Sequence, residues 1–289
     1  MANNIAKFKK YIDLLDEVYK VNAKTSILDG DNTLVRAGAN ADEIIIPKMT
    51  LDGLADYSRN SGYVNGDVTL TNETVKFNYD RGRAFTVDAM DNEETAGIAF
   101  GKLSSEFIRT KVVPEVDAFR LATYAGISGI SSATGTLASG DDALTALVTA
   151  VSKMDDDEVA EEGRVLFITS TLYNLILNVD ILKSKEIMSR FSSVVTVPQS
   201  RFYTAIKLAD GTTGGETAGG FTKAEDAKDI NFMIIQKGAI LQYPKHVVNK
   251  VVSPEENQTS DGWKFFYRSY GLADVYENKV AGIYLHHKA

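Results

Sequence analysis

The stretch DNEETAGIAFGKLSSEFIRTKVVPEVDAFRLATYAG, residues 91–126, predicts a long helix around which the rest of the chain is arranged. Asp91 is a favourable N-cap residue, and Glu94 has the spacing that completes a capping box. Unbroken, such a helix is about 50 Å long. Its apolar residues recur every three or four positions, as on the buried face of a helix: Ala96, Phe100, Leu103, Phe107, Ile108, Val112, Val116 and Phe119.

Pro114 lies inside this stretch and lacks the amide hydrogen that would bond to the carbonyl of Thr110. We therefore expect one helix with a kink at Pro114, which can serve as the axis of a plate-like subunit. Two ordinary helices that meet at Pro114 are the alternative.

The composition is that of a soluble globular protein. The 289 residues are 44% hydrophobic and 24% charged, which are ordinary values for a chain that buries a core. The absence of cysteine excludes disulfides, a thiolate nucleophile and Cys-ligated zinc. The net charge of −8 argues against a general nucleic-acid binder but does not exclude a small basic patch. We find no signal peptide and no run of about 18 apolar residues, so we expect no membrane partner.

Two segments precede the helix. Residues 1–42 are expected to form an N-terminal arm, whose first 28 residues carry one apolar helical face. That face packs either on the chain's own core or on a neighbouring subunit. Residues 43–88 alternate apolar and polar side chains around a turn-rich stretch at 56–67, which predicts a long two-stranded hairpin. Because an isolated hairpin is marginal in water, it needs another surface for its stability.

Helices and strands alternate after the long helix, which predicts a small α/β unit over residues 130–245. Ser139 and Asp142 form a capping box for one helix, whose apolar face includes Val148. A further helix is expected to follow a side-chain cap at Ser170 or Thr171. The expected strands of the unit are residues 164–169, 194–197 and 231–236, and those of the tail are 246–254, 263–270 and 279–286.

No arrangement of residues predicts catalysis, a cofactor or a metal. His286 and His287 are adjacent, so in a strand they point to opposite faces. The acidic run 155–162 does not alternate as calcium ligands do, and is expected to be a solvated helix end. The glycine-rich loop 211–220 lacks the Lys-Ser or Lys-Thr of a phosphate-binding loop and is expected to be mobile. We therefore expect no enzyme. A soluble α/β enzyme or ligand-binding protein that uses the 164–236 sheet is the rival from another class.

Basic residues near the start and the middle of the helix are the best candidates for ion pairs, either within the subunit or between subunits. They are Arg81, Arg83, Arg109 and Lys111, and the acids close to them in sequence are Asp88, Asp91, Glu93 and Glu106.

The order of these elements, together with two stretches, resembles the major capsid protein of tailed bacteriophages, which has the Hong Kong 97-type fold. The stretches are YDRGRAFTVDAMDNEET, residues 79–95, and VVNKVVSPEENQTSDGWKFFYRSYGLADVYENKVAGIYLHHKA, residues 247–289. The resemblance implies an α+β fold that consists of an N-terminal arm (1–42), an extended hairpin loop (43–88), the spine helix of a peripheral domain (89–129), an axial α/β domain (130–245) and closing strands of the peripheral domain (246–289).

The resemblance also implies the function of a major capsid protein, which assembles into hexamers and pentamers and forms an icosahedral shell around a phage genome. The implied partners are further copies of the chain, double-stranded DNA, a portal and a separate scaffolding protein, since there is no room before the arm for a cleaved scaffolding segment. The implied location is the virion, after assembly in the host cytoplasm. An encapsulin-type nanocompartment shell around a cargo enzyme is the alternative within the fold. The residues expected to act in assembly are Tyr57, Arg59, Tyr63, Arg81, Arg83 and Pro114.

Overall fold

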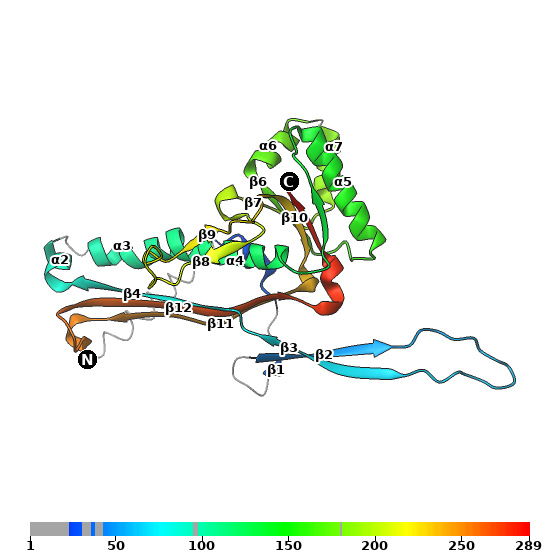
Figure 1. The fold of residues 1–289 in the computed structure, drawn as a ribbon, viewed down its shortest axis with the longest axis horizontal. Helices are drawn as coiled ribbons and strands as arrows, with labels where there is room; N and C mark the ends of the chain where they lie inside the picture. Colours follow the sequence, from blue (N-terminus) through cyan, green and yellow to red (C-terminus); the bar gives the residue numbers. More distant parts are fainter. Residues whose placement is uncertain (1–22, 31–35, 38–42, 95–97, 180) are drawn as a thin grey trace.

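The computed structural model describes residues 23–30, 36–37, 43–94, 98–179 and 181–289. The predicted helix of the N-terminal arm lies outside these residues, as do Ala96 and the side chain of Phe100. Figure 1 shows an elongated molecule in which helices α3 (Ile98–Phe107) and α4 (Val113–Ala125) lie along a three-stranded sheet. An α/β unit rises from one end of that sheet, and a two-stranded hairpin projects beyond it (Figure 1).

The long helix is present, and it is irregular. It consists of α3 (Ile98–Phe107), a π-helical turn (Ile108–Val112) and α4 (Val113–Ala125), and a separate helix, α2 (Ala89–Glu94), precedes it. The backbone is helical without interruption from α3 to the end of α4. The predicted N-cap at Asp91 is wrong, because α2 already begins at Ala89. The amide of Met90 instead donates to Asp88 Oδ1 at 2.9 Å, so the carboxylate that serves the helix start lies three residues earlier.

Pro114 lies in the first turn of α4, directly after the π-helical turn. In that turn the amide of Val113 donates to the carbonyl of Ile108, five residues back. A proline suits the first turn of a helix because it has no amide to donate, so the irregularity falls just before Pro114. The structure therefore favours one irregular helix over two helices that meet at Pro114.

The long helix packs on an antiparallel sheet with strand order β11-β12-β4. The strands are β4 (Tyr79–Asp88), β11 (Ile240–Val252) and β12 (Gly262–Val275). Alternate side chains of β12, including Phe265 and Tyr267, face the helix and join Ile108, Val112 and Val116 in one buried cluster. The apolar side chains that alternate along residues 263–270 therefore pack against those that recur at helical spacing along residues 91–126.

The predicted hairpin of 43–88 is divided in the structure. β2 (Glu43–Leu51) pairs with β3 (Val68–Lys76), whereas β4 pairs with β12. Asn78 lies between the two sheets, where its side chain donates to the carbonyl of Ala273 at 2.8 Å and accepts from its amide at 3.1 Å. This side-chain amide takes the place of a backbone pair and lets the chain pass from one sheet to the other. β1 (Arg36–Ala37) is a short third strand beside β2.

The α/β unit contains a five-stranded sheet with the order β5-β13-β10-β6-β7. Its strands are β5 (Ser131–Thr134), β6 (Arg164–Thr169), β7 (Ser193–Val197), β10 (Ile230–Gln236) and β13 (Ile283–His287). β13 pairs with β10 in this sheet, so the expectation that all the closing strands complete the helix–sheet unit is wrong for the last of them. Its apolar residues Ile283 and Leu285 are buried against α4 and β10, which explains the placement.

Three helices cover the other face of this sheet: α5 (Gly140–Asp156), α6 (Ser170–Leu177) and α7 (Ile181–Ser189). The capping box of α5 is confirmed, since Ser139 and Asp142 exchange two hydrogen bonds of 3.1 Å. Val148 is 47% exposed and does not belong to the buried face of α5. The expected side-chain cap of α6 is also wrong: its N-cap is Thr169, which makes no side-chain capping bond.

The remaining elements are short. β8 (Ile206–Leu208) and β9 (Phe221–Lys223) form a two-stranded sheet, and the 3-10 turns are Thr25–Leu28, Gln199–Arg201, Lys237–Ala239, Pro254–Glu256 and Glu277–Gly282.

Candidate functional site

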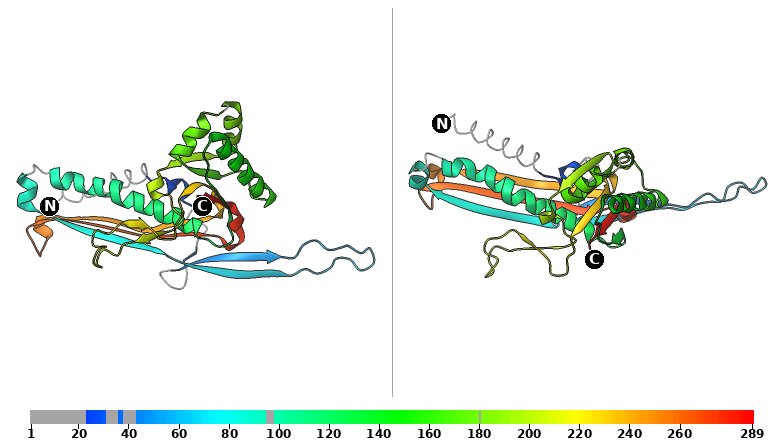
Figure 2. Two further views of the ribbon diagram at one scale, coloured as in Figure 1. Left: turned by 45° about the horizontal axis from the view of Figure 1, so that its top comes forward. Right: turned by 90° about the horizontal axis from the view of Figure 1, so that it is seen from above.

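The β2–β3 hairpin has a packed root and an uncovered remainder. At the root, Ile44, Ile46 and Val75 are buried against Leu241 and Leu272 of β11 and β12. Beyond Lys48, whose ammonium binds Glu277 at 2.8 Å, the ribbon runs free of every other described element in the views of Figures 1 and 2. The prediction that this hairpin lacks a core of its own is therefore confirmed for its outer part.

One face of the outer hairpin is apolar. The register pairs Met49 with Leu70 and Leu51 with Val68, and paired residues lie on the same face of a ribbon. These four side chains are 59–65% exposed. The opposite face carries threonines, such as the Thr50–Thr69 pair. An apolar face of this kind indicates a surface that another molecule covers.

The hairpin tip carries three of the six predicted assembly residues. Tyr57 and Tyr63 pack edge to face with their ring centroids 4.8 Å apart, and both are largely exposed. A bridge between Ser58 and Gly62 brings the two tyrosines together. Arg59 lies in the turn between them and is exposed. The tip therefore presents two aromatic rings and a cation to the solvent.

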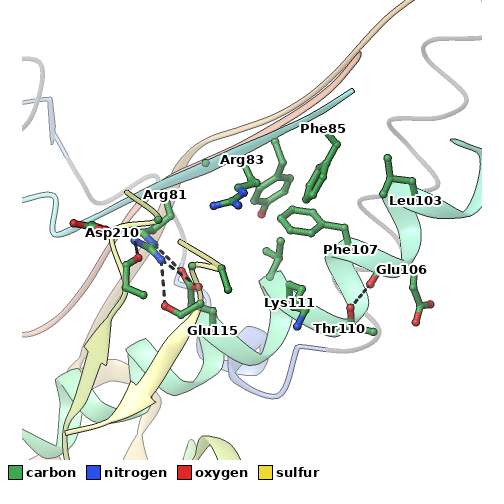
Figure 3. Close-up of a pocket in the computed structure, with 18 of the residues that line it drawn as sticks. Arg81, Arg83, Phe85, Leu103, Glu106, Phe107, Thr110, Lys111, Glu115 and Asp210 are labelled. Atoms are coloured by element: carbon green, nitrogen blue, oxygen red, sulfur yellow. Dashed lines mark hydrogen bonds and ion pairs between the residues drawn. The ribbon is translucent and has the colours of Figure 1, made fainter. Parts of the chain in front are cut away.

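Arg81, a fourth predicted residue, lies within the body of the subunit. Its Nε and Nη2 donate to Glu115 of α4 at 2.8 and 3.4 Å. Its Nη1 donates to the carbonyl of Ala209 at 2.7 Å, and Nη2 also donates to the carbonyl of Gly220 at 3.3 Å. Figure 3 shows the guanidinium turned toward Glu115 and the segment of Asp210. Arg81 therefore makes its ion pair inside the subunit.

Glu115 is the partner that the sequence analysis missed. It is 9% exposed and accepts a third hydrogen bond, from the hydroxyl of Tyr79 at 3.2 Å. Burial, followed by the charge of Glu115, raises the pKa of Tyr79 well above its ordinary value, so this hydroxyl remains a donor. Its position in the sequence could have identified it. Glu115 is an acid next to Val116, which lies on the apolar face of the helix, and a charge that is buried there requires a partner.

The loop between β8 and β9, residues 209–220, contains several hydrogen bonds of its own, and its expected mobility stays a prediction. Asp210 accepts bonds from the amides of Thr212 and Thr213 at 2.7 and 2.8 Å. The side-chain hydroxyl of Thr213 and these amides lower the pKa of Asp210. Glu216 pairs with Lys207 of β8. In the view from above in Figure 2 the loop projects to one side of the helix.

Arg83, a fifth predicted residue, lies at the edge of a cavity of about 580 Å³ between β4, the long helix and this loop. It donates to the carbonyl of Thr217 at 3.1 Å and is otherwise exposed. Phe85, Leu103 and Phe107 form an apolar wall of the cavity (Figure 3). Arg83 is therefore partly engaged by its own chain.

The other predicted charges make local contacts. Arg109 pairs with Glu106 one helical turn away, at 2.6 Å and largely exposed. Asp155, in the acidic run, binds Arg164 and Arg190 at 2.8 Å each, so this run is a network of ion pairs as well as a solvated helix end. Pro114, the sixth predicted residue, lies in the first turn of α4, and its role in assembly stays a prediction.

A second buried acid, Asp117, anchors the N-terminal segment to α4. Its carboxylate accepts from the amides of Lys24 and Thr25 at 3.0 Å each and from Arg201 at 3.0 Å. Asp117 is fully buried, and these donors offset the cost of burying its charge. Asp117 is not among the residues predicted from the sequence.

The structure offers no arrangement that points to catalysis within the described ranges. His286 is buried in β13 and shares a hydrogen bond of 3.0 Å with Asn231, whereas His287 lies toward the surface. Among the residues with described positions, no three His, Asp or Glu side chains gather as metal ligands would. In the same part of the chain, no helix combines the length and apolar character that crossing a membrane requires.

The comparisons with known proteins agree with the fold. No family model and no curated protein matches the sequence. A solved structure from Mycobacterium phage Che8 superposes with a TM-score of 0.57 at 13% identity, over 86% of this chain and 85% of that one. The capsid structure of cyanophage P-SCSP1u gives 0.56 at 13% identity, over 88% and 85%. A virus-like particle from Pyrococcus furiosus gives 0.57 at 9% identity, over 96% and 99%. At these identities the likeness establishes the fold, which is that of phage capsid structures and is α+β as the sequence predicted.

Proposed function

We propose that this chain is a major capsid protein, which assembles through hexamers and pentamers into an icosahedral shell around a phage genome. The observation that carries the proposal is the likeness of fold, over 88% of the chain, to the capsid of cyanophage P-SCSP1u. A match over 88% of the chain is larger than any one unit of the molecule, so the likeness does not rest on one common substructure.

The physical chemistry of the hairpin supports this proposal. Its cross-strand apolar pairs, Met49–Leu70 and Leu51–Val68, are more than half exposed in the isolated subunit. A two-stranded ribbon with an uncovered apolar face is marginal in water and gains stability when another surface covers it. Further copies of the chain supply such a surface in a shell. The extended hairpin then lies over a neighbouring subunit.

The other parts of the proposal follow from the same fold. The α/β unit is the axial domain that meets its copies at the centre of a capsomer, and the long helix is the spine of the peripheral domain. Double-stranded DNA, a scaffolding protein and a portal are the proposed further partners. The proposed location is the virion, after assembly in the host cytoplasm. No catalytic role is proposed.

A nanocompartment shell of the encapsulin type is the second candidate. The observation in its favour is the match to the Pyrococcus furiosus virus-like particle, which spans 96% of this chain and 99% of that one. The two candidates differ in what the shell contains: the first encloses a genome and the second a cargo enzyme.

The experiment is electron microscopy of the purified full-length protein, with analytical ultracentrifugation across a range of salt concentrations. We expect closed shells or capsomer rings. A monomer at high protein concentration under every salt condition would contradict both candidates. Co-purified protein cargo inside the shells, in the absence of DNA or scaffold, would show that the protein forms a nanocompartment and would contradict the capsid proposal.

A further inference from the structure

Arg81 of β4 forms hydrogen bonds to the long helix and to the 209–220 loop at the same time. On one side it contacts Glu115 of α4, and on the other it contacts the carbonyls of Ala209 and Gly220. Ala209 and Gly220 are the two ends of the 209–220 loop, and the amide of Ala209 donates to the carbonyl of Gly220 at 2.9 Å. A single guanidinium therefore reaches both carbonyls only while the neck of the loop is closed.

The loop belongs to the α/β unit by its attachments. The chain leaves that unit after Phe202, which is fully buried in the core with Val165 and Met233. It returns at Ile230, whose amide donates to the carbonyl of Phe202 at 3.0 Å. β8, the loop and β9 thus form an excursion of the α/β unit that reaches across to β4, and Arg81 binds this excursion.

The unit is attached to α4 at three described places. The first is the shared core, in which Leu121 and Tyr124 of α4 are fully buried. The second is the Arg81 contact at Glu115, about 9 Å earlier along the helix, since each residue adds 1.5 Å. A contact at one place permits rotation about it, whereas a second contact along the helix opposes that rotation. The third place lies between these two, where Arg201 binds Asp117 of α4 at 3.0 Å.

The arrangement depends on a guanidinium. Arginine presents its donors in a rigid planar fork, so Nε and one Nη2 hydrogen can face a carboxylate while other hydrogens face carbonyls. A lysine ammonium in this place is a point charge on a flexible stem and cannot hold Glu115 and both ends of the loop together. Arg81→Lys therefore keeps the positive charge but cannot make the simultaneous hydrogen bonds to Glu115, Ala209 and Gly220.

We propose that Arg81 is a positioning residue for assembly. By tying the neck of the 209–220 loop to Glu115, it sets the angle between the α/β unit and the helix–sheet unit at which subunits join a shell. This role rests on the proposed shell function.

The experiment compares full-length Arg81→Lys with a matched control, Arg268→Lys. Arg268 lies on the neighbouring strand β12, opposite Gly82, and makes a two-bond pair with Asp80 at 2.9 and 2.7 Å. This pair is exposed and does not touch the loop. Both variants exchange an arginine for a lysine in an ion pair of β4, so the difference between them isolates the contact with the loop.

Two measurements are made on each variant. Hydrogen exchange on the unassembled subunit reports the loop amides, such as those of Ala209, Glu216 and Gly219, which are hydrogen-bonded within the loop. We expect these amides to exchange at least about tenfold faster in Arg81→Lys and at the original rate in Arg268→Lys. Electron microscopy then reports the particles. We expect mixed diameters or open sheets from Arg81→Lys, and uniform particles from the control.

Uniform particles from Arg81→Lys overturn the role of Arg81, as do altered particles in which the loop amides keep their original protection. Absence of particles from the unmodified chain contradicts the proposed function itself, so the two failures are distinguishable.

A charge swap, Arg81→Glu with Glu115→Arg, separates the ion pair from the loop contact. The swap restores opposite charges between β4 and α4 but places a carboxylate against the carbonyls of Ala209 and Gly220. We expect a released loop and irregular particles. Uniform particles from a folded swap variant would show that the ion pair alone is sufficient, and would overturn the role of the loop contact.

Discussion

The β10 strand of the five-stranded sheet and the β3 strand of the hairpin have opposite environments. Ile234 in β10 is fully buried, with helices on one side and α4 on the other side of its sheet. Leu70 in β3 is 63% exposed, although it lies in a regular antiparallel pair. β10 pairs with a strand on each side, whereas β3 is the edge strand of its described sheet and pairs with β2. The two strands also differ in whether another layer covers their apolar side chains.

The difference shows which parts of the subunit bury their apolar side chains within the chain and which part leaves them exposed. A strand that is covered on both faces draws its stability from its own domain. A strand with an uncovered apolar face must obtain the same burial from outside. The α/β unit therefore buries its own apolar side chains within one subunit, and we propose that the hairpin completes its packing on a neighbour. The predictions below test this contrast, from the largest expected effect to the smallest.

The largest effect is expected from shortening the hairpin. Residues 53–66 are replaced by Asn-Gly, which forms a tight hairpin turn between Asp52 and Asp67, two residues that are already paired across the ribbon. We expect a folded subunit with an unchanged unfolding midpoint that no longer forms closed shells in electron micrographs. Normal shells from this variant would mean that the tip makes no essential contact.

The next effect distinguishes the two faces of the ribbon. Leu51→Lys places a charge on the apolar face, and Thr50→Lys places the same charge on the polar face one residue away. We expect the first variant to assemble at least about tenfold less efficiently, because a lysine cannot be buried there without a partner. The second should assemble normally. Equal assembly yields, measured by light scattering, would show that the apolar face is not covered.

A core truncation should act on stability alone. Phe232 is fully buried and stacks on Tyr284 and His286, with centroids 6.3 and 5.0 Å away. We expect Phe232→Ala to lower the free energy of unfolding by about 3–5 kcal/mol in urea titrations. Leu54→Ala, at the fully exposed hairpin tip, should change it by less than about 0.5 kcal/mol. Similar costs at the two positions would contradict the contrast in burial.

The smallest effect concerns pH. Burial, and secondarily the charge of His287, lowers the pKa of His286 below its ordinary value of 6.5. Between the two values the unfolded chain binds more protons than the folded one, so stability is lost as the pH falls below 6.5. The slope that this histidine contributes is at most about 1.4 kcal/mol per pH unit.

Urea titrations of the unmodified chain and of His286→Gln from pH 7.5 to 5.5 measure this slope. The unmodified chain should lose more stability toward acid than the variant, which lacks the buried imidazole. An identical pH dependence would show that His286 binds its proton equally in both states.

Much of the fold could be predicted from local patterns. The helix from α3 to α4, the capping box at Ser139 and the strands β6, β7 and β10 follow from local sequence patterns, because each pattern depends on residues of a single element. The start of α2 at Ala89 and the missing cap of α6 could not be predicted, since Asp, Ser and Thr are common both at caps and beside them.

The partners of distant elements were less predictable. The alternation in 43–88 does not reveal that the chain changes sheets at Asn78, because β3 and β4 have the same period and differ only in the strand they pair with. The pairing of β13 with β10 likewise joins segments that are distant in sequence, so local patterns do not predict it. The same limit applies to the site: Arg81 could be singled out as a charge in need of a partner, but Glu115 and the loop carbonyls are 34 and more residues away.

The most direct measurement is hydrogen exchange of the same protein before and after assembly. In the unassembled subunit, the amides of β2 and β3 beyond the root should exchange rapidly, and those of β6 and β10 should be protected. In purified particles, we expect the hairpin amides to become protected while those of β6 and β10 remain so. Hairpin amides that exchange equally fast in both states would contradict the claim that a second copy covers this surface.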